Sequence, residues 1–295
     1  LATGNINLNG TNEETHFSYD VKINKPEFDL IKMQNLFSKG YYNGKNLFIE
    51  SAQAKNDNGY MHTSGNIPFD LNIGSSTFGK YFENDLLNLK TEAELSNLPF
   101  LSPYIAELDS AEGNYEIMLN VKGPIGNLTR NGYILIQDGI LHTQLLNDPI
   151  QFINGEARLI NNKLKIKNLS ADLNIENVEN VGRENPNTHI SGEINLNKFF
   201  NPHYNLKLKS KNASFKLLFL DIHGMTNLDL SIFGRDTVYV SGKIEPEEVN
   251  VFYEFATEDI GTAIIEDQNT IMSYNLNIPF RNRAFFQNSQ IDAEI

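Results

Sequence analysis

Residues 114–123 read NYEIMLNVKG, a stretch in which Tyr115, Ile117, Leu119 and Val121 occupy every second position and Glu116, Met118, Asn120 and Lys122 lie between them. Successive side chains of a β-strand point to opposite faces of the sheet, so this pattern predicts a strand with one apolar face. The stretch YNLKLKSK at 204–211 has the same pattern. About fifteen such strands can be drawn along the chain, and most are apolar on one side only. We therefore expect an all-β protein.

Short turn signals join these expected strands at Asn43-Gly44, Asp138-Gly139 and Asn161-Asn162. A type I′ hairpin turn needs positive φ at both central residues, which Asn, Asp and Gly adopt most readily. A turn at Asn161-Asn162 pairs Leu159 with Leu164 on one face. The connections predict a long antiparallel meander.

The Asp138-Gly139 signal decides how the apolar run before it is oriented. A turn there pairs Ile136 with Leu141 on one face and places Tyr133 and Leu135 on the other. We expect the second pair to be covered partly by a neighbour on the outside.

One region is predicted to be helical. Within 78–110 four apolar residues share a helical face, and two prolines restrict helices to short pieces: Leu98, Leu101, Ile105, Leu108, Pro99 and Pro103. Residues 29–40 are ambiguous, since helical spacing there competes with β pairing of the flanking segments. We expect a β section over 1–75, a helical connection over 76–110 that could gate the sheet, and a second β section over 111–295 that continues it.

Composition excludes several classes of function. The chain has 295 residues and a net charge of -13, and its 24 Lys and Arg are scattered, which argues against nucleic acid and against a polybasic membrane patch. It has no cysteine, and no run approaches the roughly 18 apolar residues of a transmembrane helix. We expect an interior piece of a longer protein, with targeting and anchoring segments elsewhere.

Motifs for catalysis or metal binding are missing from the sequence. There is no HExxH, no G-x-S-x-G and no phosphate-binding loop. The histidines are dispersed: His16, His62, His142, His189, His203 and His223. We expect no enzymatic activity, no metal and no cofactor.

Strands with one apolar face must cover that face in a sandwich, in a closed barrel, or in a bent trough that accepts an apolar ligand. Fifteen strands at about 4.8 Å each would stack to roughly 70 Å, and no Pro/Gly/Ser-rich linker divides the chain. The elongated trough is favoured.

The order of elements resembles a known family. Residues 120–173, NVKGPIGNLTRNGYILIQDGILHTQLLNDPIQFINGEARLINNKLKIKNLSADL, look like the recurring unit of the TamB/AsmA-like translocation and assembly proteins. Residues 190–215 and 222–255 continue in that family's order, and 63–71 and 272–295 are similar to its segments. One departure is Gly126-Asn127-Leu128, where the unit usually has Asn-Pro.

The resemblance implies a curved, taco-like antiparallel sheet with an apolar interior and one or two short helices. It implies a location in the bacterial periplasm. It also implies an inner-membrane anchor that lies outside this chain, and an outer-membrane barrel partner that is bound through regions outside this chain. It also implies phospholipid transport and support of outer-membrane protein assembly.

The residues that the alternation assigns to a lipid-lining face would contact acyl chains without any catalytic group. They are Ile117, Leu119, Val121, Ile134, Ile136, Leu141, Leu159, Leu164, Ile166, Ile194, Leu196, Leu206, Leu208, Leu228, Leu230 and Ile232. The simpler reading is that these residues pack against each other or against a covering helix.

Two other classes stay open. A secreted or surface structural module, such as an adhesin, would close its apolar faces into a dry core. A membrane-embedded β-barrel would need strands of about 9 to 11 residues and aromatic girdles, and most runs here are shorter.

Overall fold

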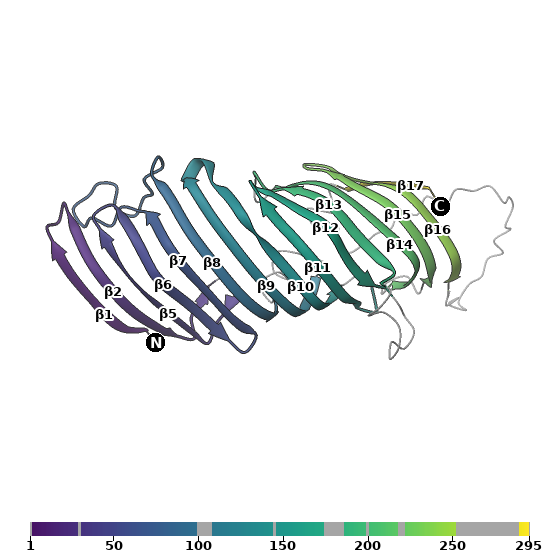
Figure 1. Cartoon of the computed structure of the whole chain (residues 1–295), viewed down its shortest axis with the longest axis horizontal. Helices are drawn as coiled ribbons and strands as arrows, with labels where there is room; N and C mark the ends of the chain where they lie inside the picture. Colours follow the sequence, from purple (N-terminus) through teal and green to yellow (C-terminus); the bar gives the residue numbers. More distant parts are fainter. Residues whose placement is uncertain are drawn as a thin grey trace, which may run out of the picture.

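The computed structural model describes residues 2–28, 31–98, 108–143, 146–173, 186–198, 201–217, 222–251 and 289–294. These form one elongated, curved sheet of fifteen strands (Figure 1). In sheet order the strands are β1 (Ala2–Gly10), β2 (Thr15–Asn24), β5 (Asn35–Asn43), β6 (Asn46–Asn56), β7 (Gly59–Pro68), β8 (Leu86–Asn97), β9 (Leu108–Pro124), β10 (Thr129–Thr143), β11 (Ile150–Ile160), β12 (Lys163–Asp172), β13 (Thr188–Asn195), β14 (His203–Leu217), β15 (Ile222–Gly234), β16 (Val238–Val251) and β17 (Ser289–Glu294).

The sheet is an open meander. Each strand from β1 to β16 pairs antiparallel with the next strand of the sheet, as predicted, whereas β17 pairs parallel with β16. A two-stranded ribbon of β3 (Glu27–Phe28) and β4 (Ile31–Lys32) lies outside this order. Within the described ranges, each strand makes extensive contacts only with the strands next to it in the sheet. The sheet is therefore a single layer there.

Strand register places the apolar residues of successive strands on the same face. One row of register partners crosses the sheet from β7 to β16 and consists of Met61, Ala93, Ile117, Ile134, Ala157, Ile166, Gly192, Leu206, Ile232 and Val240. We call the face that carries this row the inner face, and the opposite face, which carries Glu116 and Lys207, the outer face.

The inner face is the concave one. Along β8 the outer-face residues are exposed, whereas Leu89 and Leu95 of the inner face are half-buried and Ala93 is buried. Packing against a buried cluster contributes to this shielding at Leu95, and the curvature of the sheet toward the inner face contributes along the rest of the strand.

Glycines on the inner face allow this curvature. Gly65 has φ +138° and Gly192 has φ +132°, a backbone region that L side chains rarely adopt. A Cβ at Gly192 would lie 2.2 Å from the carbonyl oxygen of Asn205 on the next strand. Missing side chains therefore let strands bend toward this face and approach closely. Further inner-face glycines are Gly40, Gly132, Gly155 and Gly242.

The prediction of a turn at Asp138-Gly139 was wrong. Both residues lie inside β10, where Asp138 has φ +50° and forms a β-bulge against both neighbouring strands. Its N–H donates to Asn154 Oδ1 at 3.0 Å. The bulge takes up the positive φ that the turn signal implied, and the strand continues. Ile136 and Leu141 nevertheless share the inner face, because the extra residue of the bulge shifts the alternation by one position.

Bulges also make the strands longer than the runs read from the sequence: β9 has 17 residues and β10 has 15. The Asn161-Asn162 turn is confirmed, with φ of +49° and +65° and Leu159 opposite Leu164.

The predicted helical connection over 76–110 was wrong where the structure describes it. Residues 86–97 form β8 and residues 108–110 begin β9. The only helical element in the described ranges is a single 3-10 turn, Ile125–Asn127. Good helix formers such as Leu, Glu and Lys concealed the alternation of 86–97, and pairing with β7 and β9 overrides their propensity. Residues 99–107, which include Leu101, Ile105 and both prolines, lie outside the described residues.

The ambiguous stretch 29–40 is also extended where it is described. It contributes β4 and the start of β5, and β5 pairs with both β2 and β6. Its helical spacing is therefore incidental, since sheet pairing on both sides determines the backbone conformation.

Candidate functional site

The residues predicted to line a groove all belong to the inner face. Leu119, Leu159, Leu164 and Ile194 fall in one row across β9 to β13, with Gly132 between the first two. Leu208 and Leu230 are direct partners in β14 and β15. Leu196 follows β13, and its N–H donates to the carbonyl oxygen of Asn162 at 2.7 Å.

A hollow of about 490 Å³ opens on this face near Gly132. Because Gly132 has no side chain, it leaves space between its partners Leu119 and Leu159. The hollow is lined by residues of β9 to β12 and the end of β13: Ile117, Met118, Leu119, Arg130, Tyr133, Ile134, Leu159, Leu164 and Leu196. Met118 and Tyr133 belong to outer-face positions of their strands, and the inner-face side chains of the lining are apolar apart from Arg130.

Part of the predicted groove is a packed cluster. Leu98, Leu108, Ala111 and Tyr115 are buried together, and Leu95, Ile117, Ile136 and Leu141 pack against them. The alternative of ordinary packing therefore holds for Ile117, Ile136 and Leu141, whereas the rows from Leu119 to Leu230 lie beyond the cluster.

The end of the inner face formed by β2 and β5 is covered by the connection between β7 and β8. Tyr42 of β5 is 1% exposed and stacks on Phe17 with 5.3 Å between ring centroids. Its hydroxyl accepts hydrogen bonds from the Leu71 N–H at 3.0 Å and from Asn72 Nδ2 at 3.3 Å. Burial raises the pKa of Tyr42.

Asp70 holds that connection, which we call the capping loop (residues 69–85), in shape. Its carboxylate is 2% exposed and accepts hydrogen bonds from Ser75 Oγ at 2.5 Å and Thr77 Oγ1 at 2.6 Å. Asn72 donates to the same carboxylate from its backbone and its side chain. The hydrogen bonds from Ser75 and Thr77 lower the pKa of Asp70 to about 2. These hydrogen bonds fix the turn of the capping loop that contacts Tyr42.

The outer face is polar and carries exposed ion pairs, among them Lys163 with Glu193 at 2.9 Å and Lys209 with Asp229 at 3.0 Å. Such pairs keep the outer face in water and contribute little to stability.

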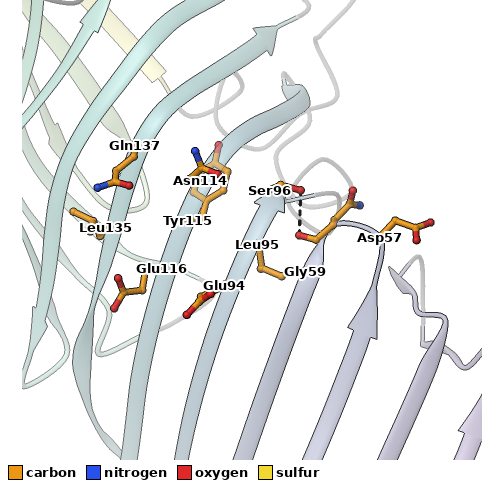
Figure 2. A pocket seen from close by; sticks show the side chains of 11 residues that line it. Asp57, Gly59, Glu94, Leu95, Ser96, Asn114, Tyr115, Glu116, Leu135 and Gln137 are labelled. Carbon is orange, nitrogen blue, oxygen red and sulfur yellow. Dashed lines mark hydrogen bonds between the residues drawn. The ribbon is translucent and has the colours of Figure 1, made fainter.

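A shallow outer hollow of about 490 Å³ lies between β7 and β10, and Figure 2 shows Glu94, Glu116, Leu135 and Gln137 beside it on neighbouring strands. Tyr133 donates a hydrogen bond to Glu116, which raises the pKa of the tyrosine. Tyr133 and Leu135 thus belong to the outer side of β10, as predicted. The outside neighbour of Tyr133 is a carboxylate.

The sequence-based prediction stopped short of the full face. The inner-face rows continue through β8 to β1, where Leu89, Ile49, Phe17, Leu8 and Ile6 extend them. The same alternation could have identified these residues.

Neither metal chemistry nor a membrane-spanning helix is found in the part of the chain that the structure describes. No three or more His, Asp or Glu side chains there are grouped so that they could hold a metal ion. No helix there is long and apolar enough to cross a bilayer.

Comparison with protein-family models, with curated proteins and with solved structures finds no match to this chain. The geometry of the inner face and the sequence patterns are the features that indicate a function.

Proposed function

We propose that the inner face binds the acyl chains of phospholipids, and that the chain is a segment of a bridge that conducts lipids between the inner and outer membranes. The observation that carries the proposal is the set of apolar rows on a concave face that no second layer covers in the described ranges. The resemblance to TamB/AsmA-like proteins supports the same reading.

The energetics suit an acyl chain. Removing a CH₂ group from water is worth about 0.8 kcal/mol, so a long chain gains many small contributions along an apolar row. The row from Met61 to Val240 crosses ten strands, or about 43 Å at the spacing of paired strands. A lipid could move along such a row by exchanging one weak contact for the next.

In this proposal the inner face contacts lipid and the outer face contacts water. Glu116, Lys207 and Asp229 on the outer face stay in water, while Leu119, Leu206 and Leu230 on the inner face shield the lipid. A closed structural module would need a second layer over the inner face, and the described residues contain none beyond the local covers at Tyr42 and Tyr115.

The cellular setting is part of the same proposal. The chain lies in the bacterial periplasm, and the inner-membrane anchor and the contact with an outer-membrane barrel partner belong to regions outside it. Transport of phospholipid supports outer-membrane protein assembly, and no enzymatic step is involved.

Site-specific photo-crosslinking tests the lipid-binding face. Probes at Leu119, Leu206 and Leu230 should capture phospholipid from vesicles or cells. Probes at Glu116, Lys207 and Asp229 of the same strands are the matched controls and should not. Equal labelling of the two faces would rule out lipid binding by the inner face.

A further inference from the structure

The tip of the capping loop, residues 73–81, exposes three large apolar side chains. Ile73 is 58% exposed, Phe78 56% and Tyr81 55%. Other residues of the same loop contact the buried ring of Tyr42 and cover the inner face there. One part of the loop is therefore a cover, and the tip is an apolar surface in water.

Hydrogen bonds and ring packing hold the tip in this conformation. The Gly74 N–H donates to the carbonyl oxygen of Asn12 at 2.7 Å. Tyr81 forms an isolated antiparallel bridge with Phe69, and the centroids of their rings lie 4.9 Å apart. The loop thus presents the three side chains in a fixed setting, and exposed apolar groups of this kind mark contact sites.

The contacts of the loop place it at one edge of the sheet. Asn12 lies in the turn between β1 and β2, and Gly44 lies in the turn between β5 and β6. The loop binds both turns, since Gly74 donates to the first and Asn72 Nδ2 donates to the Gly44 carbonyl oxygen at 2.8 Å. A body that meets this edge of the sheet can therefore contact the tip and the covered end of the inner face together.

The size of the exposed apolar surface favours a lipid surface over a protein partner. Large side chains have about 200 Å² each, so three that are a little more than half exposed offer on the order of 300 Å². A stable protein interface needs about 800 Å² from each partner. A bilayer needs no complementary surface, because its interface accepts apolar and aromatic side chains one at a time, and Tyr is enriched there.

The charge of the tip fits the same partner. Lys80 is the only charged residue of 73–81 and is exposed, although the whole chain carries a net charge of -13. A lysine between Phe78 and Tyr81 can keep its ammonium group among lipid phosphates while its alkyl stem lies along apolar groups. The tip therefore combines apolar, aromatic and cationic side chains in nine residues.

We propose that the tip of the capping loop inserts Ile73, Phe78 and Tyr81 into the interface of a phospholipid bilayer and so docks this edge of the sheet on a membrane surface. The inference goes beyond the proposed function and does not depend on it, because it concerns a bilayer bound at a loop and not single lipids bound along the inner face.

A single tryptophan can report the insertion, because the chain has none. Phe78→Trp in the full chain should shift its emission to the blue on addition of phosphatidylcholine vesicles, and brominated acyl chains should quench it. These vesicles are uncharged, so the net charge of the chain does not oppose binding. Phe233→Trp is the matched control, because Phe233 is 45% exposed on the outer face of β15; its emission should not change.

Cosedimentation with the same vesicles measures the contribution of the tip. Phe78→Ser removes an exposed ring and should weaken vesicle binding about tenfold without unfolding the protein. Phe233→Ser removes an equally exposed ring elsewhere and should leave binding unchanged. Leu206→Asp interrupts the inner face and should also leave it unchanged, which separates bilayer docking from lipid binding along the sheet.

Three outcomes would overturn the docking of the tip. The wild type does not bind vesicles, or Phe78→Ser binds them as well as the wild type, or Leu206→Asp alone loses binding. A self-association of the wild type that Phe78→Ser abolishes, without vesicle binding, would assign the tip to a second copy of the chain. None of these results bears on photo-crosslinking of single lipids at Leu119 and Leu230, so the two proposals fail separately.

Discussion

Two regions of the inner face, one at β2 and β5 and one from β9 to β14, have the same alternating pattern and different surroundings. At β2 and β5 the capping loop covers the face, Tyr42 is 1% exposed, and Asp70 anchors the cover. From β9 to β14 the row residues Leu119, Leu164 and Leu206 stay half-buried, and a hollow opens beside Leu119 and Leu164. Alternation thus determines which side of a strand is apolar, whereas the connecting loops determine whether that side becomes a core or a groove.

The largest effect is expected from Tyr42→Ala, because it removes a buried ring and two hydrogen bonds to the capping loop. The free energy of unfolding should fall by about 3–5 kcal/mol. Tyr204→Ala, at an inner-face position of the open region, is the comparison and should cost at most half as much. Urea denaturation of both variants measures the difference, and equal losses would contradict the contrast between covered and open ends.

Gly192→Ala should destabilise the open region by about 1–3 kcal/mol, because φ is +132° and the new Cβ would meet the carbonyl oxygen of Asn205. Ser191→Ala, one residue earlier on the outer face, is the control and should be nearly neutral. Hydrogen exchange should show faster opening of β13 and β14 in the glycine variant alone. Equal losses of stability and equal rates of hydrogen exchange in the two variants would contradict the role of inner-face glycines in bending the sheet.

Asp70→Asn should lower stability by about 2 kcal/mol at pH 7 and loosen the capping loop. The folded pKa of Asp70, about 2, lies below the unfolded value of 3.8. The stabilisation is therefore complete above about pH 5 and is lost progressively as the pH falls toward 2. Denaturation at pH 7 and pH 2.5 should show this loss in the wild type and not in Asp70→Asn. Glu83→Gln, in the same loop, should retain the wild-type pH dependence.

Leu206→Asp should have a small effect on stability, less than about 1 kcal/mol, because water reaches this part of the inner face. Lipid capture by a probe at Leu230 should fall strongly, since a carboxylate interrupts the apolar row between β13 and β15. Lys207→Asp places the same charge on the outer face and should leave capture unchanged. Global unfolding of Leu206→Asp, measured by circular dichroism, would indicate a packed core at this site.

Much of this fold can be predicted from the sequence, because a single layer of hairpins is specified by local information. The alternation of 114–123 identifies the inner face, and Asn161-Asn162 identifies a turn and its register. The local sequence led to a wrong prediction where the same residues favour two different backbone conformations. Asp138-Gly139 favours positive φ in a bulge as well as in a turn, and the Leu, Glu and Lys of 86–97 favour a helix in isolation.

The cover over Tyr42 could not be predicted, because it depends on Asn72, thirty residues further along the chain. The contact between Arg130 and Asn162 could not be predicted for a similar reason, because it follows from the pairing of hairpins and has no local pattern. The assignment of the inner face to lipid stays a prediction for crosslinking to test.

Because each strand contacts chiefly its two sheet neighbours, the molecule behaves as a one-dimensional array. Its stability is then close to a sum of hairpin and neighbour terms, and unfolding can start at one end without reaching the other. Because distant strands do not contact each other, inserting one hairpin would extend the sheet by about 10 Å and leave distant strands unchanged. The length of such a chain can therefore change in steps of one hairpin without any change in the rest of the sheet.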